Sequence, residues 1–439
     1  MAAETPFAYQ QAWYPVSPLQ DLDPRRPQPL TLLGEPYVIW KPPLPGSHWQ
    51  VFLDRCPHRL APLSEGRLDR VSGQLMCSYH GWQFDAEGLC RRIPQADPAV
   101  PEPGQARHLC ATRLPCREAA DLLWLWPDAA SADRAGATPL PISSFLEQAL
   151  SSPGFVIGSV LRDLPYDWQT LVENVADPSH VPFAHHGIQG RRERAAPIPL
   201  VMEQETPEQM VATVESRSIA MRTRITFQPP ALLEYVFLLP GGKEMGLITW
   251  CVPVAPGRSR IVALFPRNFA QRQHTLVPRW WDHATNRNAV LDGDLLLLRH
   301  QERLLAGQSW RQAYRLPTRA DRLVIAVRRW MDRHGVPFAL DGDGSAQANV
   351  IPADPLLSMD RFQQHTTHCR SCRRALAWTE AFQLSGAAVF VLSLPAAVLW
   401  PTFQGVWLLL GAWALLAAVL LRWQLRPRFR ARLYEQWRR

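Results

Sequence analysis

The chain has 439 residues, enough for two or three globular domains, and it includes 41 prolines and 18 tryptophans. Its formal net charge is +8, but residues 422–439 hold seven arginines and one glutamate, which leaves about +2 on everything before them. This nearly neutral body excludes a basic nucleic-acid-binding protein, so we expect no nucleic-acid partner.

The first sixteen residues, MAAETPFAYQQAWYPV, contain no basic segment followed by an apolar one. We therefore expect no cleaved export signal. The spacing of the cysteines suits a reducing compartment better than a disulfide scaffold.

Residues 10–130 contain short β-branched or aromatic runs bounded by proline and glycine. These runs predict a small all-β domain, which we place at residues 1–140. The sequence PDAASADRAGATPLP, residues 127–141, then has the composition of a linker.

Two loops of this domain each offer one thiolate and one imidazole. CPHR supplies Cys56 and His58, and CSYHGW supplies Cys77 and His80. In a Rieske [2Fe–2S] centre one iron takes two cysteines and the other takes two histidines, so each loop must give one ligand to each iron. Zinc sites usually pair like with like. The pattern predicts a Rieske cluster rather than two unrelated buried cysteines with surface histidines.

Residues 163–187 form a second group of polar side chains. A helix entering from Trp168 would place three of them near one face at i, i+3 spacing. These three are Asn174, Asp177 and His180. Pro182 would then break the helix, so that His185 could reach the same point.

Two imidazoles and a later carboxylate make the 2-His-1-carboxylate arrangement of non-haem Fe(II) oxygenases, which leaves coordination positions open. We therefore predict a mononuclear Fe(II) site on His180 and His185 in a catalytic domain at residues 141–345. The alternative is that His180, His185 and His186 are ordinary polar residues near a helix end.

The carboxylate should come from VLDGDLLLLRHQER, residues 290–303, where Asp292 and Asp294 compete. On a helix their side chains would point about 200° apart, so only one could reach the iron. The alternative is that both are solvated residues at a helix start.

Further along, apolar runs over residues 220–254 predict strands, and residues 316–335 predict an amphipathic helix ended by Gly335. Residues 341–362 have the composition of a mobile connector. The connector region, 346–380, also contains Cys369 and Cys372 in a C-x-x-C pair flanked by His365, His368 and arginines, which would lower the thiol pKa values. A redox-responsive pair, a local metal site and an inert pair all fit this pattern.

Two uncharged apolar stretches follow, 382–400 and 406–421, separated by PTFQG. Each is near the lower length limit for crossing a bilayer. Arginines flank the pair on both outer sides, so the positive-inside rule predicts a transmembrane hairpin at 381–422 with the catalytic body and a basic tail, 423–439, in the cytoplasm. Buried core helices or one interfacial hairpin are the alternatives.

CPHR, CSYHGW and N-x-x-D-x-x-H-x-x-x-x-H together resemble the oxygenase component of Rieske non-haem iron oxygenases. AWYPV, DLPYDWQTLVENVADPSHVPFAHHG, LPTRAD, the C-x-x-C pair and the apolar tail resemble the branch that contains pheophorbide a oxygenase, the lethal leaf spot or cell-death suppressor group. This resemblance spans roughly residues 10–425. Because no plastid transit peptide is present, it suggests a bacterial, cyanobacterial homologue.

The resemblance implies an α+β fold: a Rieske domain, a helix-grip catalytic domain with an antiparallel sheet, and a head-to-tail trimer in which one subunit's cluster serves its neighbour's iron. It implies that Asp177 couples a cluster histidine, with His80 as the partner, to an iron-bound histidine. It favours Asp294 as the iron ligand, because Glu302 follows eight residues later. It also implies ferredoxin as the electron donor and thioredoxin as a partner of Cys369 and Cys372.

We therefore expect a Rieske oxygenase anchored in the thylakoid or plasma membrane that inserts oxygen from O₂ into a large apolar cyclic substrate. A chlorophyll-derived tetrapyrrole such as pheophorbide a is the first choice. Another lipophile, such as a sterol, carotenoid or secondary metabolite, is the alternative within this class. The alternative from a different class is a non-catalytic membrane electron carrier or redox sensor. Such a protein would hold about two irons per chain, whereas an oxygenase would hold about three.

Overall fold

The computed structural model describes residues 5–97, 107–216, 221–338 and 360–430. Most of the connector expected at 341–362, and the end of the basic tail expected at 423–439, lie outside these ranges. The chain divides into two compact units. The first comprises Met1–Val181, Arg194–Gln271 and Leu298–Ile351, and the second comprises Pro182–Glu193, Arg272–Leu297 and Pro352–Arg439.

The first unit begins with three small antiparallel sheets, which confirm the all-β start of the chain. One contains β1 (Tyr14–Pro18), β11 (Leu122–Leu125) and β10 (Cys116–Ala119). The second contains β2 (Gln28–Leu32), β3 (Glu35–Trp40), β4 (Gln50–Leu53) and β9 (Arg113–Leu114). The third contains β5 (Arg67–Leu68), β6 (Leu75–Met76), β7 (Gln83–Phe84) and β8 (Cys90–Arg92). Aromatic residues such as Trp40, Phe52 and Phe84 fill the core between the second and third sheets, because these residue types pack well on pleated surfaces.

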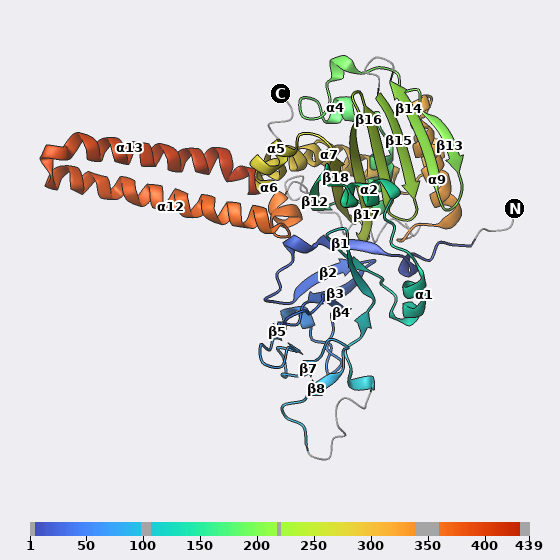
Figure 1. The fold of residues 1–439 in the computed structure, drawn as a ribbon, viewed down its shortest axis with the longest axis horizontal. Coiled ribbons are helices and arrows are strands. Elements are labelled where there is room, and N and C mark those ends of the chain that lie inside the picture. The colour runs from blue at the N-terminus through green and yellow to red at the C-terminus, as the bar shows by residue number, and fades with distance from the viewer. Residues whose placement is uncertain (1–4, 98–106, 217–220, 339–359, 431–439) are drawn as a thin grey trace. The chain divides into compact units, whose positions relative to one another are not determined.

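A seven-stranded antiparallel sheet forms the other part of this unit (Figure 1). Its order is β12 (Val156–Leu164), β18 (Arg258–Arg267), β17 (Lys243–Ala255), β16 (Leu232–Leu239), β15 (Met221–Gln228), β14 (Met210–Ser216) and β13 (Val201–Glu205). The strands expected over residues 220–254 are therefore confirmed. Each strand pairs with its sequence neighbour except β12, which pairs with β18 and closes the order at one edge.

Among the helices that pack on this sheet are α3 (Trp168–Ala176), which lies against β16, β17 and β18, and α9 (Arg322–His334), which lies against β13 and β14. Inside their contact, the buried Arg328 guanidinium donates hydrogen bonds to Glu173 and, at 2.9 Å, to Gln169. The end of α9 at Gly335, whose φ is +78°, confirms the expected glycine stop.

The stretch expected to be a linker is instead partly helical. It contains α1 (Ala132–Ala137), which precedes α2 (Ser144–Ser151). Alanine, which is frequent in this stretch, favours helix. The Asp128 side chain also accepts a hydrogen bond from the Ala130 N–H at the start of the turn that precedes α1. Ala135 is fully buried and its carbonyl accepts from Arg117, so the stretch packs as part of the unit.

The helix expected to carry Asn174, Asp177 and His180 on one face ends too early for that arrangement. Asp177 is already extended, with φ −96° and ψ 108°, because Pro178 disfavours a helical conformation in the residue before it. His180 therefore lies beyond α3. Pro182 also does not break a helix, since it occupies the first turn of α4 (Val181–Ala184), where a missing N–H costs nothing.

The second unit is helical. Its elements include α5 (Gln271–Leu276, whose first residue belongs to the first unit), α6 (Arg279–Asp282), a π-helical turn η8 (His283–Arg287), the first part of α7 (Asn288–Leu305), a second π-helical turn η10 (Phe362–Thr366), α12 (Arg370–Leu399), α13 (Gln404–Leu420) and α14 (Pro427–Arg430). The short helix α8 (Trp310–Ala313) belongs to the first unit.

Helices α12 and α13 lie side by side as a hairpin (Figure 1). Small residues allow this approach: Gly386 lies against Ala414, and Gly411 against Ser393. The stretches Arg370–Leu399 and Pro401–Arg430 are each long and apolar enough to cross a membrane, and most of their apolar side chains are exposed. This confirms the two apolar helices, although the first begins about eleven residues before the expected 381.

Candidate metal centres

The two cysteine–histidine loops have the same backbone closure. In each loop the cysteine N–H donates to the carbonyl five residues later and the cysteine carbonyl accepts from the N–H four residues later, at 2.8–3.0 Å. The residue that donates this second bond has a left-handed backbone in both loops, Leu60 with φ +60° and Gly81 with φ +73°. Two such loops present Cys56 and Cys77 in equivalent positions.

The sulfur and nitrogen donors of this site differ in their exposure. Cys56 and Cys77 are buried, whereas His58 is exposed and His80 is half-buried. The two imidazole rings lie 4.5 Å apart, and the Trp82 ring stacks on His58 at 4.7 Å. Burial raises the pKa of Cys56 to about 12, so ionising this thiol requires a nearby cation, which a bound iron supplies. The donor set fits a [2Fe–2S] cluster with one cysteine-held and one histidine-held iron.

A second donor group contains the two predicted iron-binding histidines and one of the two candidate aspartates. The Asp294 Oδ2 atom lies 3.4 Å from His185 Nε2, and both side chains are buried. His180, His185 and Asp294 each offer one ligand atom, and those atoms lie within 4.8 Å of one another. Two imidazoles and one carboxylate at this spacing fit a mononuclear Fe(II) ion.

Asp292, the competing carboxylate, has a different partner. Its Oδ2 accepts a hydrogen bond of 2.7 Å from Arg361 Nε, and both side chains are buried. Gly293, between the two aspartates, has the Ala184 carbonyl so close that a β-carbon would overlap it. The helix α7 therefore directs one carboxylate to His185 and the other to an arginine.

Asp177 follows α3 and contacts His180. The His180 Nδ1 atom lies 2.6 Å from the Asp177 carbonyl oxygen and 3.7 Å from its Oδ2. Burial alone would raise the pKa of the Asp177 carboxyl, but hydrogen bonds from His180 and Ser179 outweigh burial and hold it below its usual value. Over the described part of one chain, Asp177 makes no hydrogen bond to His80, the partner expected from the resemblance.

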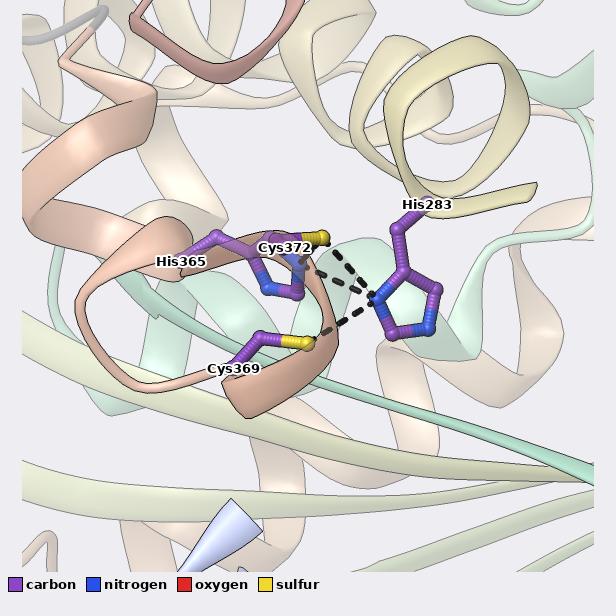
Figure 2. A group of neighbouring side chains, drawn as sticks. All are labelled: His283, His365, Cys369 and Cys372. Carbon is purple, nitrogen blue, oxygen red and sulfur yellow. Dashed lines mark hydrogen bonds between the residues drawn. The ribbon is translucent and has the colours of Figure 1, made fainter. Parts of the chain in front are cut away.

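A third donor group joins the C-x-x-C pair to a histidine that the sequence did not indicate (Figure 2). Its members, all buried, are His283, His365, Cys369 and Cys372. A hydrogen bond with Cys372 holds the pKa of Cys369 well below its usual range, and burial lowers the pKa of His283. His283 lies 82 positions before His365, so no local spacing could have linked them.

Two models of known protein families match parts of this chain. The profile of the Rieske [2Fe–2S] domain matches residues 12–112, and that of pheophorbide a oxygenase matches residues 227–310. The first match spans both cysteine–histidine loops and confirms the predicted Rieske domain and its [2Fe–2S] cofactor.

Pheophorbide a oxygenase of Oryza sativa subsp. japonica is 39% identical over 403 residues, which cover 85% of this chain and 74% of the relative. Flavonoid 8-hydroxylase 2 of Ocimum basilicum is 32% identical over 87% of this chain and 76% of its own length. The crystal structure of dicamba monooxygenase bound to dicamba has a TM-score of 0.59 at 21% identity, covers 74% of this chain and 97% of that chain, and shows a shared fold. The chain belongs to the pheophorbide a oxygenase family of Rieske non-haem iron oxygenases.

Proposed function

We propose that this oxygenase inserts oxygen from O₂ into a large apolar cyclic substrate, with a chlorophyll-derived tetrapyrrole such as pheophorbide a as first choice. The observation that carries the proposal is the group of His180, His185 and Asp294 in a chain 39% identical to pheophorbide a oxygenase. A domain arrangement of residues 1–140 for the cluster, 141–345 for catalysis, 346–380 as connector, 381–422 as anchor and 423–439 as basic tail accompanies it.

In this proposal Cys56, His58, Cys77 and His80 hold the cluster, and His180, His185 and Asp294 hold the mononuclear iron. When bound, the cluster supplies electrons and the ferrous ion activates O₂ beside the substrate. The protein's own contribution is orientation. With its Nδ1–H donated to the Asp177 carbonyl, His180 keeps the lone pair of Nε2 for metal, and this hydrogen bond fixes the ring's tautomer.

Electrons should come from a ferredoxin or a ferredoxin-like protein. A head-to-tail homotrimer would explain why Asp177 makes no hydrogen bond to His80 within one chain, since the bridging histidine would then belong to a neighbouring copy. The half-buried Asp177 carboxylate, ionised because of its lowered pKa, can accept a hydrogen bond from such a histidine.

The α12–α13 hairpin would anchor the enzyme in a membrane, thylakoid or plasma membrane, with the catalytic part and the C-terminus on the cytoplasmic side. The described arginines in the first turns of α12 and after the end of α13 support this orientation. They are Arg370, Arg373, Arg374, Arg422, Arg426, Arg428 and Arg430. A membrane location suits a lipophilic substrate.

Oxidation of a flavonoid-like lipophile is the second candidate, and the 32% identity to a flavonoid 8-hydroxylase favours this substrate class over sterols and carotenoids. The substrate would then be a planar polycyclic phenol rather than a tetrapyrrole.

The test is to incubate reduced full-length protein and ferredoxin with ¹⁸O₂ and separate panels of chlorophyll intermediates and flavonoids. We expect label in a tetrapyrrole product by mass spectrometry, and none with Asp294→Ala protein that retains its cluster spectrum. Label only in a flavonoid product would support the second candidate, and label in neither panel would contradict both.

A further inference from the structure

We propose that His283, His365, Cys369 and Cys372 form a third metal site, which binds a divalent cation of the zinc class. The site is separate from the cluster loops and from the His180, His185 and Asp294 group. Its ligands come from two segments of the second unit, one before α7 and one at the start of α12. Its occupancy does not depend on which substrate the oxygenase uses.

Four of the six distances between donor atoms are close to the edges of a tetrahedral site. With zinc bonds of about 2.05 Å to nitrogen and about 2.3 Å to sulfur, tetrahedral edges are about 3.3 Å between two nitrogens and about 3.6 Å between nitrogen and sulfur. The His283 Nδ1 and His365 Nε2 atoms lie 3.1 Å apart. The sulfur of Cys372 lies 3.3 Å from His365 Nε2, and 3.8 Å from His283 Nδ1. The Cys369 sulfur lies 3.6 Å from the same His283 atom.

Hydrogen bonding alone does not account for this arrangement. His283 Nδ1 is approached by one nitrogen and two sulfurs (Figure 2), whereas a ring nitrogen has either one proton or one lone pair to offer. Four donor atoms that lie within 4.8 Å of one another instead surround a common point. Two imidazoles and two thiolates are the ligand types that favour Zn²⁺.

The backbone prepares the two sulfurs for ionisation. Cys369 is the N-cap of α12 and Cys372 lies in its first turn, where the positive end of a 30-residue helix stabilises thiolates. The His365 carbonyl accepts the Cys369 N–H at 2.9 Å, which closes the turn between two of the ligands. Because Ala284, Leu376 and Phe429 cover this site, its polar atoms are shielded from water, and a cation would compensate their burial.

The site would fasten the segment that leads into α7 to the base of the hairpin. The buried pair of Arg361 and Asp292 joins the same two segments a few residues away. A metal clip between His283 and His365 closes a loop of more than eighty residues, and such closure restricts the unfolded chain. Zinc would thereby fix the start of the helix that carries Asp294.

A disulfide-forming redox pair is the competing use of Cys369 and Cys372, which are not joined by a disulfide in the structure. The two uses differ in measurable ways. A metal site holds zinc and protects both thiols, whereas a redox pair holds no metal and forms a disulfide in air.

The experiment uses full-length protein, purified anaerobically in detergent without an affinity tag that binds metal. We expect about one zinc per chain in addition to the iron, and, in protein produced with Co²⁺, the visible bands of a tetrahedral site with thiolate ligands. His365→Ala and Cys372→Ser should each reduce zinc content at least tenfold. His368→Ala, a neighbouring histidine outside the group, should retain it.

A measurement on the unaltered protein guards against variants that do not fold. Alkylation of Cys369 and Cys372, followed by peptide mass spectrometry, should be at least tenfold slower before zinc is removed by a chelator than afterwards. Absence of zinc with a Cys369–Cys372 disulfide formed in air, a fourth iron in place of zinc, or equal alkylation rates would each overturn the proposal.

Discussion

The backbone carbonyl oxygen of Ala184 lies only 2.4 Å from the position that a β-carbon on Gly293 would take. Gly293 separates Asp292 from Asp294, and Ala184 precedes His185. The missing side chain therefore lets the histidine segment lie directly on the helix that carries the carboxylate. A hypothetical Gly293 β-carbon would also come within 3.4 Å of His185 Nδ1.

Gly293→Ala should reduce mononuclear iron at least tenfold while the cluster keeps its signal, because the added carbon forces the backbone at Ala184 away from α7. Iron analysis combined with electron paramagnetic resonance of the reduced cluster measures both quantities. Gly136→Ala is a suitable control, since nothing lies within 4 Å of its β-carbon position and its backbone is helical. A full content of mononuclear iron in Gly293→Ala would contradict this prediction, because it would show that the backbone at Ala184 can shift without loss of iron binding.

The two aspartates of α7 should respond differently to substitution. Asp294→Ala should remove mononuclear iron and leave the cluster spectrum unchanged. Asp292→Asn leaves the buried Arg361 without its countercharge and should destabilise the protein by about 3–5 kcal/mol. Iron content and thermal unfolding distinguish the two effects. If mononuclear iron were retained in Asp294→Ala but lost in Asp292→Asn, Asp292 rather than Asp294 would be the iron ligand.

Glu302 should make stability depend on pH. Its carboxylate accepts the Asp167 N–H at 2.7 Å at the start of α3, and burial raises its pKa to about 7. Because this folded-state pKa exceeds the unfolded value, the stabilisation is complete below about pH 4.5 and is lost as the pH rises through about 7. Relative to Glu302→Gln, the unaltered protein should lose roughly 1–3 kcal/mol between about pH 5 and about pH 8.

The measurement is the Tm of both proteins in one detergent across this pH range. The Tm of the unaltered protein should fall relative to that of Glu302→Gln as the pH increases, since glutamine keeps the hydrogen bond but does not ionise. A difference independent of pH would mean that Glu302 does not titrate in this window.

Charges on the hairpin test whether it enters a membrane. Val391 and Leu416 are exposed on α12 and α13, Val391 at the middle of the uncharged stretch 382–400 and Leu416 within the stretch 406–421. Replacing both with arginine should abolish carbonate-resistant membrane association, because each arginine at a bilayer centre costs about 3 kcal/mol. Val71→Arg, at an exposed site in the first unit, should have no effect. Unchanged association of the double variant would place the hairpin outside the bilayer core.

Local sequence was sufficient for features whose parts lie close together in the chain. The cluster loops each carry two ligands within four residues, and Gly335 directly follows α9. By contrast, the partners of Asp292 and of the C-x-x-C pair, Arg361 and His283, lie 69 and more than 80 positions away. Periodic patterns of residue types along the sequence do not indicate contacts between residues so far apart.

The error at α3 had a different cause. The i, i+3 spacing of three polar residues suggested a helix through His180, but the conformational effect of Pro178 on Asp177 is stronger than that pattern. The same local rule, applied to Pro178 rather than Pro182, would have ended the helix correctly.

The unequal exposure of the cluster loops gives the Rieske centre an enclosed side and an open side. Dissolved reagents can reach the exposed His58 ring and the half-buried His80 ring, whereas the sulfurs of Cys56 and Cys77 are buried. Damage by peroxide should consequently start with release of the histidine-held iron, and the sulfur-held iron should outlast it.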